Sequence, residues 1–162
     1  MFQPDEDGIL AVVDASSSRR MMACGVIYLL GIMLIYVAIA TPPSLFLMLL
    51  VLGMGIGAML LAEKLRRATL TKIVMTEETI SSSDGTVLAR MDEIISVDRG
   101  AFAFKPSNGF TLKMQTKQPR GWAPGVWWRV GRYVGVGGVV SAGQSKFMAE
   151  QIALRIVARR AK

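Results

Sequence analysis

Residues 21–62 read MMACGVIYLLGIMLIYVAIATPPSLFLMLLVLGMGIGAMLLA and contain no charged side chain. An α-helix rises about 1.5 Å per residue, so a helix over residues 21–40 would be about 30 Å long, the thickness of a bilayer's hydrocarbon core. A helix over residues 45–62 is just long enough to cross the same core. Pro42 and Pro43 end the first helix, because proline does not continue a helix. The short connection predicts an antiparallel transmembrane hairpin.

The charges that flank the hairpin predict its orientation. Arg19 and Arg20 precede the first apolar run, Lys64, Arg66 and Arg67 follow the second, and the connection carries no charge. The positive-inside rule therefore places both termini in the cytoplasm. A signal peptide is a poorer explanation, because the apolar run is too long and the preceding tail is acidic. A core hairpin of a soluble protein would have a polar face, which these helices lack.

The composition argues against several classes of function. The 162-residue chain has a net charge of +7, no histidine and one cysteine, Cys24. Histidine-based acid–base catalysis, Ser-His or Cys-His nucleophiles and an internal disulfide are therefore excluded, and the commonest metal ligand is missing. No phosphate-binding loop, zinc-ligand spacing or G-x-S-x-G motif is present. We expect no enzymatic activity, no cofactor and no metal site.

The remaining sequence divides around the hairpin. We expect a cytoplasmic tail over residues 1–20, a juxtamembrane linker over residues 63–69 and a small cytoplasmic α+β domain over residues 70–162. From Ala68 onward there are fourteen Lys or Arg against seven Asp or Glu. Such a basic surface usually binds nucleic acid or anionic membrane. The hairpin favours the membrane, so we expect membrane lipid as a partner and no nucleic acid.

The cytoplasmic domain has the pattern of short antiparallel strands followed by one helix. Ser141 or Ser145 can cap a helix that runs to about Arg160. Its predicted apolar stripe is Phe147, Met148, Ile152, Ile156 and Val157. We expect about seven strands, and Asp84-Gly85 forms a hairpin turn between two of them. The candidate segments for these strands are residues 70–75, 79–83, 86–91, 93–98, 101–105, 110–116, 126–130 and 133–140.

This order resembles the bacterial membrane-anchored PH-like proteins, in which a two-span hairpin carries a basic, strand-rich module. The similar phrases are IVMTEETISSSDGTVLARMDEIISVD, residues 73–98, and SKFMAEQIALRIVARR, residues 145–160. The resemblance implies a PH-like antiparallel barrel closed at one end by the C-terminal helix, and no catalysis. It also implies a bacterial inner, cytoplasmic membrane location.

The most distinctive segment is residues 117–133, KQPRGWAPGVWWRVGRY, which holds all three tryptophans. Tryptophan together with arginine is typical of protein interfaces and of the membrane–water boundary. Adjacent strand residues point to opposite faces, so either Trp127 or Trp128 can instead fill the core. The predicted partner or lipid interface consists of Arg120, Trp122, Trp127, Trp128, Arg129, Arg132 and Tyr133.

Two further sets of residues belong to the hairpin. Gly53 and Gly57 have the GxxxG spacing that lets helix backbones approach closely in lipid. They indicate either packing within the hairpin or a docking face for another membrane protein. Lys64, Arg66 and Arg67 form a juxtamembrane basic cluster that fixes topology and attracts anionic lipid.

These observations favour a non-catalytic accessory or assembly subunit of a bacterial inner-membrane protein complex. The hairpin would pack beside a larger membrane complex, and the PH-like domain would bind it through the aromatic and basic segment. The alternative is a membrane-binding module that responds to anionic lipid. Homo-oligomerisation is left open by the sequence.

Overall fold

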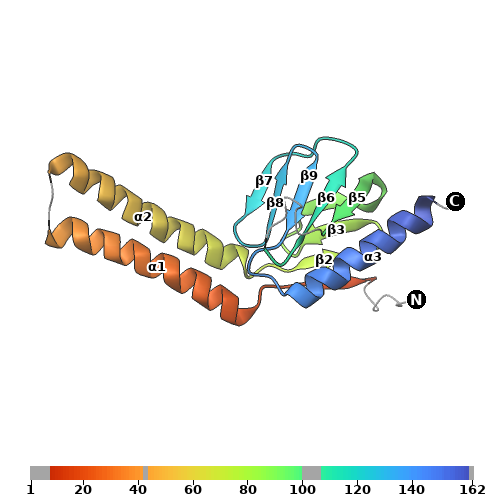
Figure 1. Cartoon of the computed structure of the whole chain (residues 1–162), viewed down its shortest axis with the longest axis horizontal. Helices are drawn as coiled ribbons and strands as arrows, with labels where there is room; N and C mark the ends of the chain where they lie inside the picture. The colour runs from red at the N-terminus through yellow and green to blue at the C-terminus, as the bar shows by residue number, and fades with distance from the viewer. Residues whose placement is uncertain (1–7, 42–43, 100–106, 161–162) are drawn as a thin grey trace. The chain divides into compact units, whose positions relative to one another are not determined.

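The computed structural model describes residues 8–41, 44–99 and 107–160. The chain divides into two compact units. One unit is the helical hairpin of residues 17–67. The other unit combines the segments on both sides of the hairpin, so the hairpin is an insertion within a discontinuous, strand-rich domain (Figure 1).

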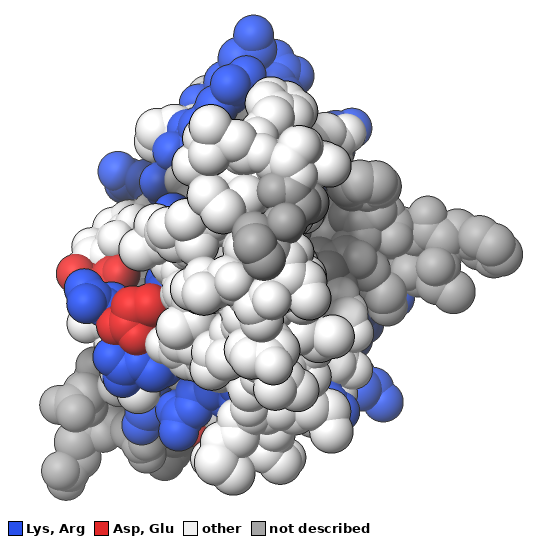
Figure 2. Space-filling view, turned by 90° about the vertical axis from the view of Figure 1, so that its left-hand side faces the viewer, with Lys and Arg blue, Asp and Glu red and all other residues white. Residues whose placement is uncertain are grey.

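The hairpin consists of α1, Ser17–Ala40, and α2, Leu45–Ala68. Both helices are long and apolar enough to cross a membrane, as the sequence predicts. Most of their large apolar side chains are exposed. In Figure 2 the loop end of the hairpin faces the viewer, and the surface nearest the viewer carries no acidic or basic side chain. Such a surface is unusual for a helix pair in water and suits a hydrocarbon solvent.

Both helices extend beyond the apolar runs on the side where the hairpin joins the rest of the chain. The helix α2 continues through the segment expected as a linker and ends at Ala68. Glu63 explains this continuation, because it forms ion pairs with Arg66 at i+3 and with Arg67 at i+4. Pairs at these spacings lie on one helix face and stabilise it.

Close packing within the hairpin is centred on Gly31 and Gly55. A β-carbon at position 55 would lie 2.7 Å from Ile35 Cγ1 and 3.1 Å from the Gly31 carbonyl oxygen. By contrast, a β-carbon at Gly53 or Gly57 would meet nothing within 4 Å. Of the two possibilities for Gly53 and Gly57, packing within the hairpin is therefore wrong, because they lie on a face turned away from α1; a docking face for another membrane protein stays a prediction.

The strand-rich unit begins with a strand from the N-terminal tail. In the four-stranded antiparallel sheet the strand order is β1-β2-β3-β4. The strand β1, Ala11–Val13, pairs with β2 in the register Val13↔Ile73. Residues 1–20 are therefore not merely a tail, because this segment supplies an edge strand of the sheet. The other strands are β2, Ile73–Met75, β3, Thr79–Ser82, and β4, Val87–Arg90.

The Asp84-Gly85 turn joins β3 to β4 as predicted. Gly85 has a φ of +88°, a conformation that favours glycine. The backbone N–H of Thr86 donates to Asp84 Oδ1 at 2.9 Å. This hydrogen bond lowers the pKa of Asp84 below its ordinary value, because it favours the ionised carboxylate.

The remaining strands form a five-stranded antiparallel sheet in the order β5-β6-β9-β8-β7. Among the described residues the nine strands form two sheets and not a closed barrel of about seven strands. A 3-10 turn at Met91–Glu93 separates the last strand of the first sheet from β5. The predicted strand 101–105 lies outside the described residues. The strands are β5, Ile94–Asp98, β6, Phe110–Met114, β7, Gly121–Ala123, β8, Trp127–Val130, and β9, Tyr133–Val136.

The inner faces of both sheets share one hydrophobic core with the C-terminal helix. This helix, α3, spans Ala142–Arg160, as expected. Met148 and Ile152 are fully buried and Ile156 is nearly so, which confirms most of the predicted stripe. Val157 is 66% exposed, so the prediction that it belongs to the buried stripe is wrong. It lies about 100° around the helix from Ile156, and Ala149 is buried in its stead.

Candidate interaction surface on the five-stranded sheet

Pairing between β7, β8 and β9 sorts the predicted interface residues onto two faces. Trp122 is opposite Trp128 across β7 and β8, and Val130 is opposite Tyr133 across β8 and β9. Directly opposed residues share a face of the sheet. Trp122, Val130 and Tyr133 are 54%, 55% and 48% exposed, so this is the outer face. We call Trp122, Trp128, Val130 and Tyr133 the aromatic face.

Gly135 of β9 leaves room for the Trp128 indole to lie directly on the neighbouring strand. Trp128 pairs with Gly135 of β9, and a β-carbon at position 135 would lie 2.3 Å from Trp128 Cε2. Because Gly135 has no side chain, the indole can rest on the strand and remains only half-buried. The centre of the aromatic face is therefore fixed by the backbone beneath it.

Trp127 and Arg129 do not belong to this surface, because strand alternation turns them inward. Trp127 is only 7% exposed and is part of the core. The Arg129 guanidinium lies over its ring, 5.3 Å from the centroid, and donates to the Val87 carbonyl oxygen of the other sheet. Burial lowers the pKa of Arg129 from its ordinary value, because desolvation disfavours the charged form. The hydrogen bond from Arg129 to Val87 links the two sheets.

Three cations border the aromatic face. Arg120 precedes β7, Arg132 lies in the turn between β8 and β9, and both are exposed. Lys113 of β6 is exposed and pairs with Tyr133, so its side chain emerges on the same face. Lys113 is not among the predicted interface residues, because it lies one strand before the distinctive segment 117–133. The surface is therefore an apolar, aromatic centre with a basic edge.

Two of the three juxtamembrane basic residues form ion pairs with Glu63. Glu63 accepts hydrogen bonds from Arg66 Nε and Nη2, both at 2.8 Å, and from Arg67 Nε at 2.7 Å. The Tyr28 hydroxyl of α1 also donates to Glu63, at 3.0 Å. Both arginines are therefore paired within the hairpin, and Lys64 lies exposed beside them. The network ties the charged end of α2 to α1.

Nothing in the described part of the chain forms a metal centre. No group of three His, Cys, Asp or Glu side chains is placed to hold an ion there. The chemistry available at the aromatic face is apolar and aromatic contact, with cationic hydrogen-bond donors at the edge. Comparison of this chain with known protein families, curated proteins and solved structures finds no match.

Proposed function

We propose that this protein is a non-catalytic accessory or assembly subunit of a bacterial inner-membrane protein complex. In this proposal the hairpin crosses the membrane, both termini are cytoplasmic and the strand-rich unit is a PH-like domain. The aromatic face would bind a cytoplasmic surface of the partner. The two antiparallel sheets and the C-terminal helix support the PH-like assignment.

The observation that carries the proposal is the exposure of three large apolar side chains side by side on a rigid sheet. Contiguous apolar surface is costly in water and usually marks a binding site. Tryptophan, tyrosine and arginine are the residue types enriched in protein interfaces and in their energetic centres. The fixed indole of Trp128 also means that little side-chain freedom would be lost on binding.

Truncation of the aromatic face should release the partner. Changing Trp122 and Tyr133 to Ala should weaken association more than tenfold, since central aromatic residues of an interface contribute about 2 kcal/mol or more each. Co-purification in mild detergent at native expression level measures this loss. The control is Leu154→Ala, which removes an even more exposed apolar side chain from α3 and should have no effect.

A photo-crosslinking residue at position 122 provides the direct measurement of contact. We expect one predominant protein adduct from position 122 and none from position 154. Recovery of the wild-type chain as a lone monomer, with no adduct from either position, would count decisively against an accessory role.

The alternative function, an anionic-lipid-responsive module, is favoured by the basic edge of the aromatic face. Arg120, Arg132 and Lys113 could contact anionic headgroups while Trp122 and Tyr133 enter the interfacial layer. In nanodiscs, exchange of phosphatidylcholine for phosphatidylglycerol should then shift the tryptophan emission of the full chain to shorter wavelength. The shift should disappear in the Arg120→Glu, Arg132→Glu variant. Identical spectra in the two lipids would remove this alternative.

A further inference from the structure

Strand pairing fixes which side chains lie beside one another at the basic edge of the aromatic face. Lys113 of β6 is opposite Tyr133 of β9, and Tyr133 is opposite Val130 of β8. Arg120 lies two residues before Trp122, so strand alternation turns both to the same face. Extension of the β7–β8 register by one pair places Arg120 opposite Val130. We call these four residues, in the order Lys113, Tyr133, Val130 and Arg120, the edge row.

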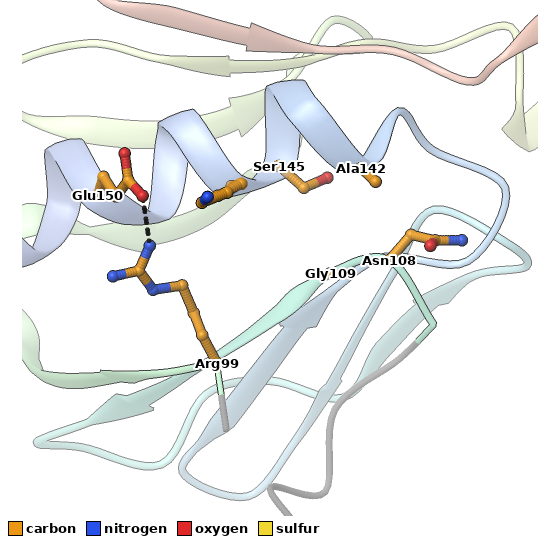
Figure 3. A pocket seen from close by; sticks show the side chains of 7 residues that line it. Arg99, Asn108, Gly109, Ala142, Ser145 and Glu150 are labelled. Atoms are coloured by element: carbon orange, nitrogen blue, oxygen red, sulfur yellow. Dashed lines mark hydrogen bonds and ion pairs between the residues drawn. The ribbon is translucent and has the colours of Figure 1, made fainter. Parts of the chain in front are cut away.

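The two cations of the edge row have no acidic partner in the part of the chain that the structure describes. Neither Lys113 nor Arg120 forms an ion pair there. Arg99, by contrast, is paired with Glu150 of α3 at 3.2 Å (Figure 3). Because both edge-row cations are exposed, an acidic side chain of another molecule can reach each of them.

Acidic residues are scarce on the same side of the five-stranded sheet. At the outer-face positions defined by pairing between the described strands, the only one is Asp98 of β5, opposite Thr111. Glu93, which precedes β5, accepts hydrogen bonds from Thr116 Oγ1 at 2.8 Å and from Gln118 Nε2 at 2.9 Å. The cations that border the aromatic face therefore outnumber the carboxylates, and the face complements an anionic partner.

The spacing of the two cations favours an extended segment as that partner. In the sheet β6 and β7 are separated by β9 and β8, so three inter-strand distances of about 4.8 Å place the Lys113 and Arg120 backbones about 14 Å apart. An extended chain covers about 13 Å in four residues, and its residues i, i+2 and i+4 point to one side. An α-helix needs about nine residues for the same distance, and residues i and i+9 point to opposite sides.

We propose that the aromatic face binds an extended acidic segment of the partner protein, with the pattern acid-x-apolar-x-acid. This inference rests on the proposed function and names the chemistry of its partner. The two carboxylates pair with Lys113 and Arg120, and the apolar side chain between them packs on Tyr133 and Val130. A nucleic acid strand fits less well, because its phosphates are continuous and Val130 offers them no hydrogen-bond donor.

The test uses the full chain in a neutral detergent and a fluorescein-labelled peptide with this pattern, GTETFTETG. Fluorescence anisotropy should show saturable binding to the full chain and none to empty micelles. The peptide GTTEEFTTG has the same composition but adjacent acids, and should bind about threefold more weakly. Lys113→Gln and Arg120→Gln should each weaken GTETFTETG binding about threefold, as expected for exposed ion pairs. Lys72→Gln is the matched control, because Lys72 is exposed but precedes β2 in the other sheet.

Exchange of the charges distinguishes direct contact from damage to the fold. The Lys113→Glu, Arg120→Glu variant should lose GTETFTETG and bind GTKTFTKTG, in which both acids are replaced by lysine. Binding of GTKTFTKTG would also show that the sheet of this variant is intact. The inference is overturned if GTETFTETG does not bind the wild type, if GTTEEFTTG binds it as tightly, or if the charge-exchanged variant still prefers GTETFTETG.

Two other anions provide competing outcomes of the same measurement. A labelled ten-nucleotide oligothymidine that binds the wild type more tightly than GTETFTETG would identify a single-stranded nucleic acid as the occupant. Displacement of GTETFTETG by phosphatidylglycerol added to the micelles would identify lipid headgroups. Either result overturns the acidic segment.

Co-purification of the partner separates this inference from the proposed function. Loss of the partner from the Trp122→Ala, Tyr133→Ala variant, with full retention by the Lys113→Gln, Arg120→Gln variant, would overturn the acidic segment alone. Retention by both variants would overturn the proposed role of the aromatic face as well.

Discussion

Val13→Asp should prevent the strand-rich unit from folding stably. Val13 is fully buried in β1, opposite Ile73 of β2, which is also fully buried. An aspartate at this position would place an unpaired carboxylate in the core, which costs about 4 kcal/mol or more. Denaturant unfolding of the full chain, followed by the fluorescence of the buried Trp127, measures the loss.

The neighbouring position is the control for this experiment. Val12 belongs to the same strand but is only half-buried and points to the opposite face. Val12→Asp should therefore cost much less than Val13→Asp. If both variants unfold at the wild-type denaturant concentration, β1 is not part of the sheet.

Gly55→Leu should disrupt the hairpin. The new side chain would meet Ile35 and the backbone of Gly31, and backbone cannot move aside as a flexible side chain can. Overpacking of this kind costs about 1–3 kcal/mol, and more where backbone must move. We expect a lower melting temperature in detergent, measured from the loss of helical circular dichroism.

Gly57→Leu is the matched variant, two positions along the same helix. Nothing lies within 4 Å of a β-carbon at this position, so the hairpin should melt as the wild type does. The GxxxG spacing alone predicts that Gly57→Leu is the more harmful variant. A larger destabilisation by Gly57→Leu than by Gly55→Leu would contradict the helix contact described above.

Much of the fold could be predicted because its signals are local. Two uncharged runs predicted the hairpin. The alternation of apolar and polar residues predicted strands such as β6, where Phe110, Leu112 and Met114 are fully buried. Neither β1 nor β7 was among the predicted strand segments. The partner of β1 lies about 60 residues later, so only the folded chain reveals the pairing.

The sites depend on register, which the sequence specifies less well. Alternation predicts that Trp127 and Trp128 face opposite sides but does not say which one is inside. GxxxG spacing identifies a small-residue face but not the face that meets α1, which here contains Gly55. The contacts of α3 with β1, β5 and β6 could not be predicted either, because they depend on how the helix packs against the sheets.

The insertion of the hairpin between β1 and β2 has a consequence for biogenesis. β1 leaves the ribosome about 60 residues before β2, so the first sheet stays incomplete until both helices have been synthesised. In the arrangement we propose, a chain with only one of the two helices in the membrane would have β1 and β2 on opposite sides of the bilayer. In that arrangement the pairing of these two strands would depend on correct threading, because only a chain with both helices in the membrane could complete the first sheet.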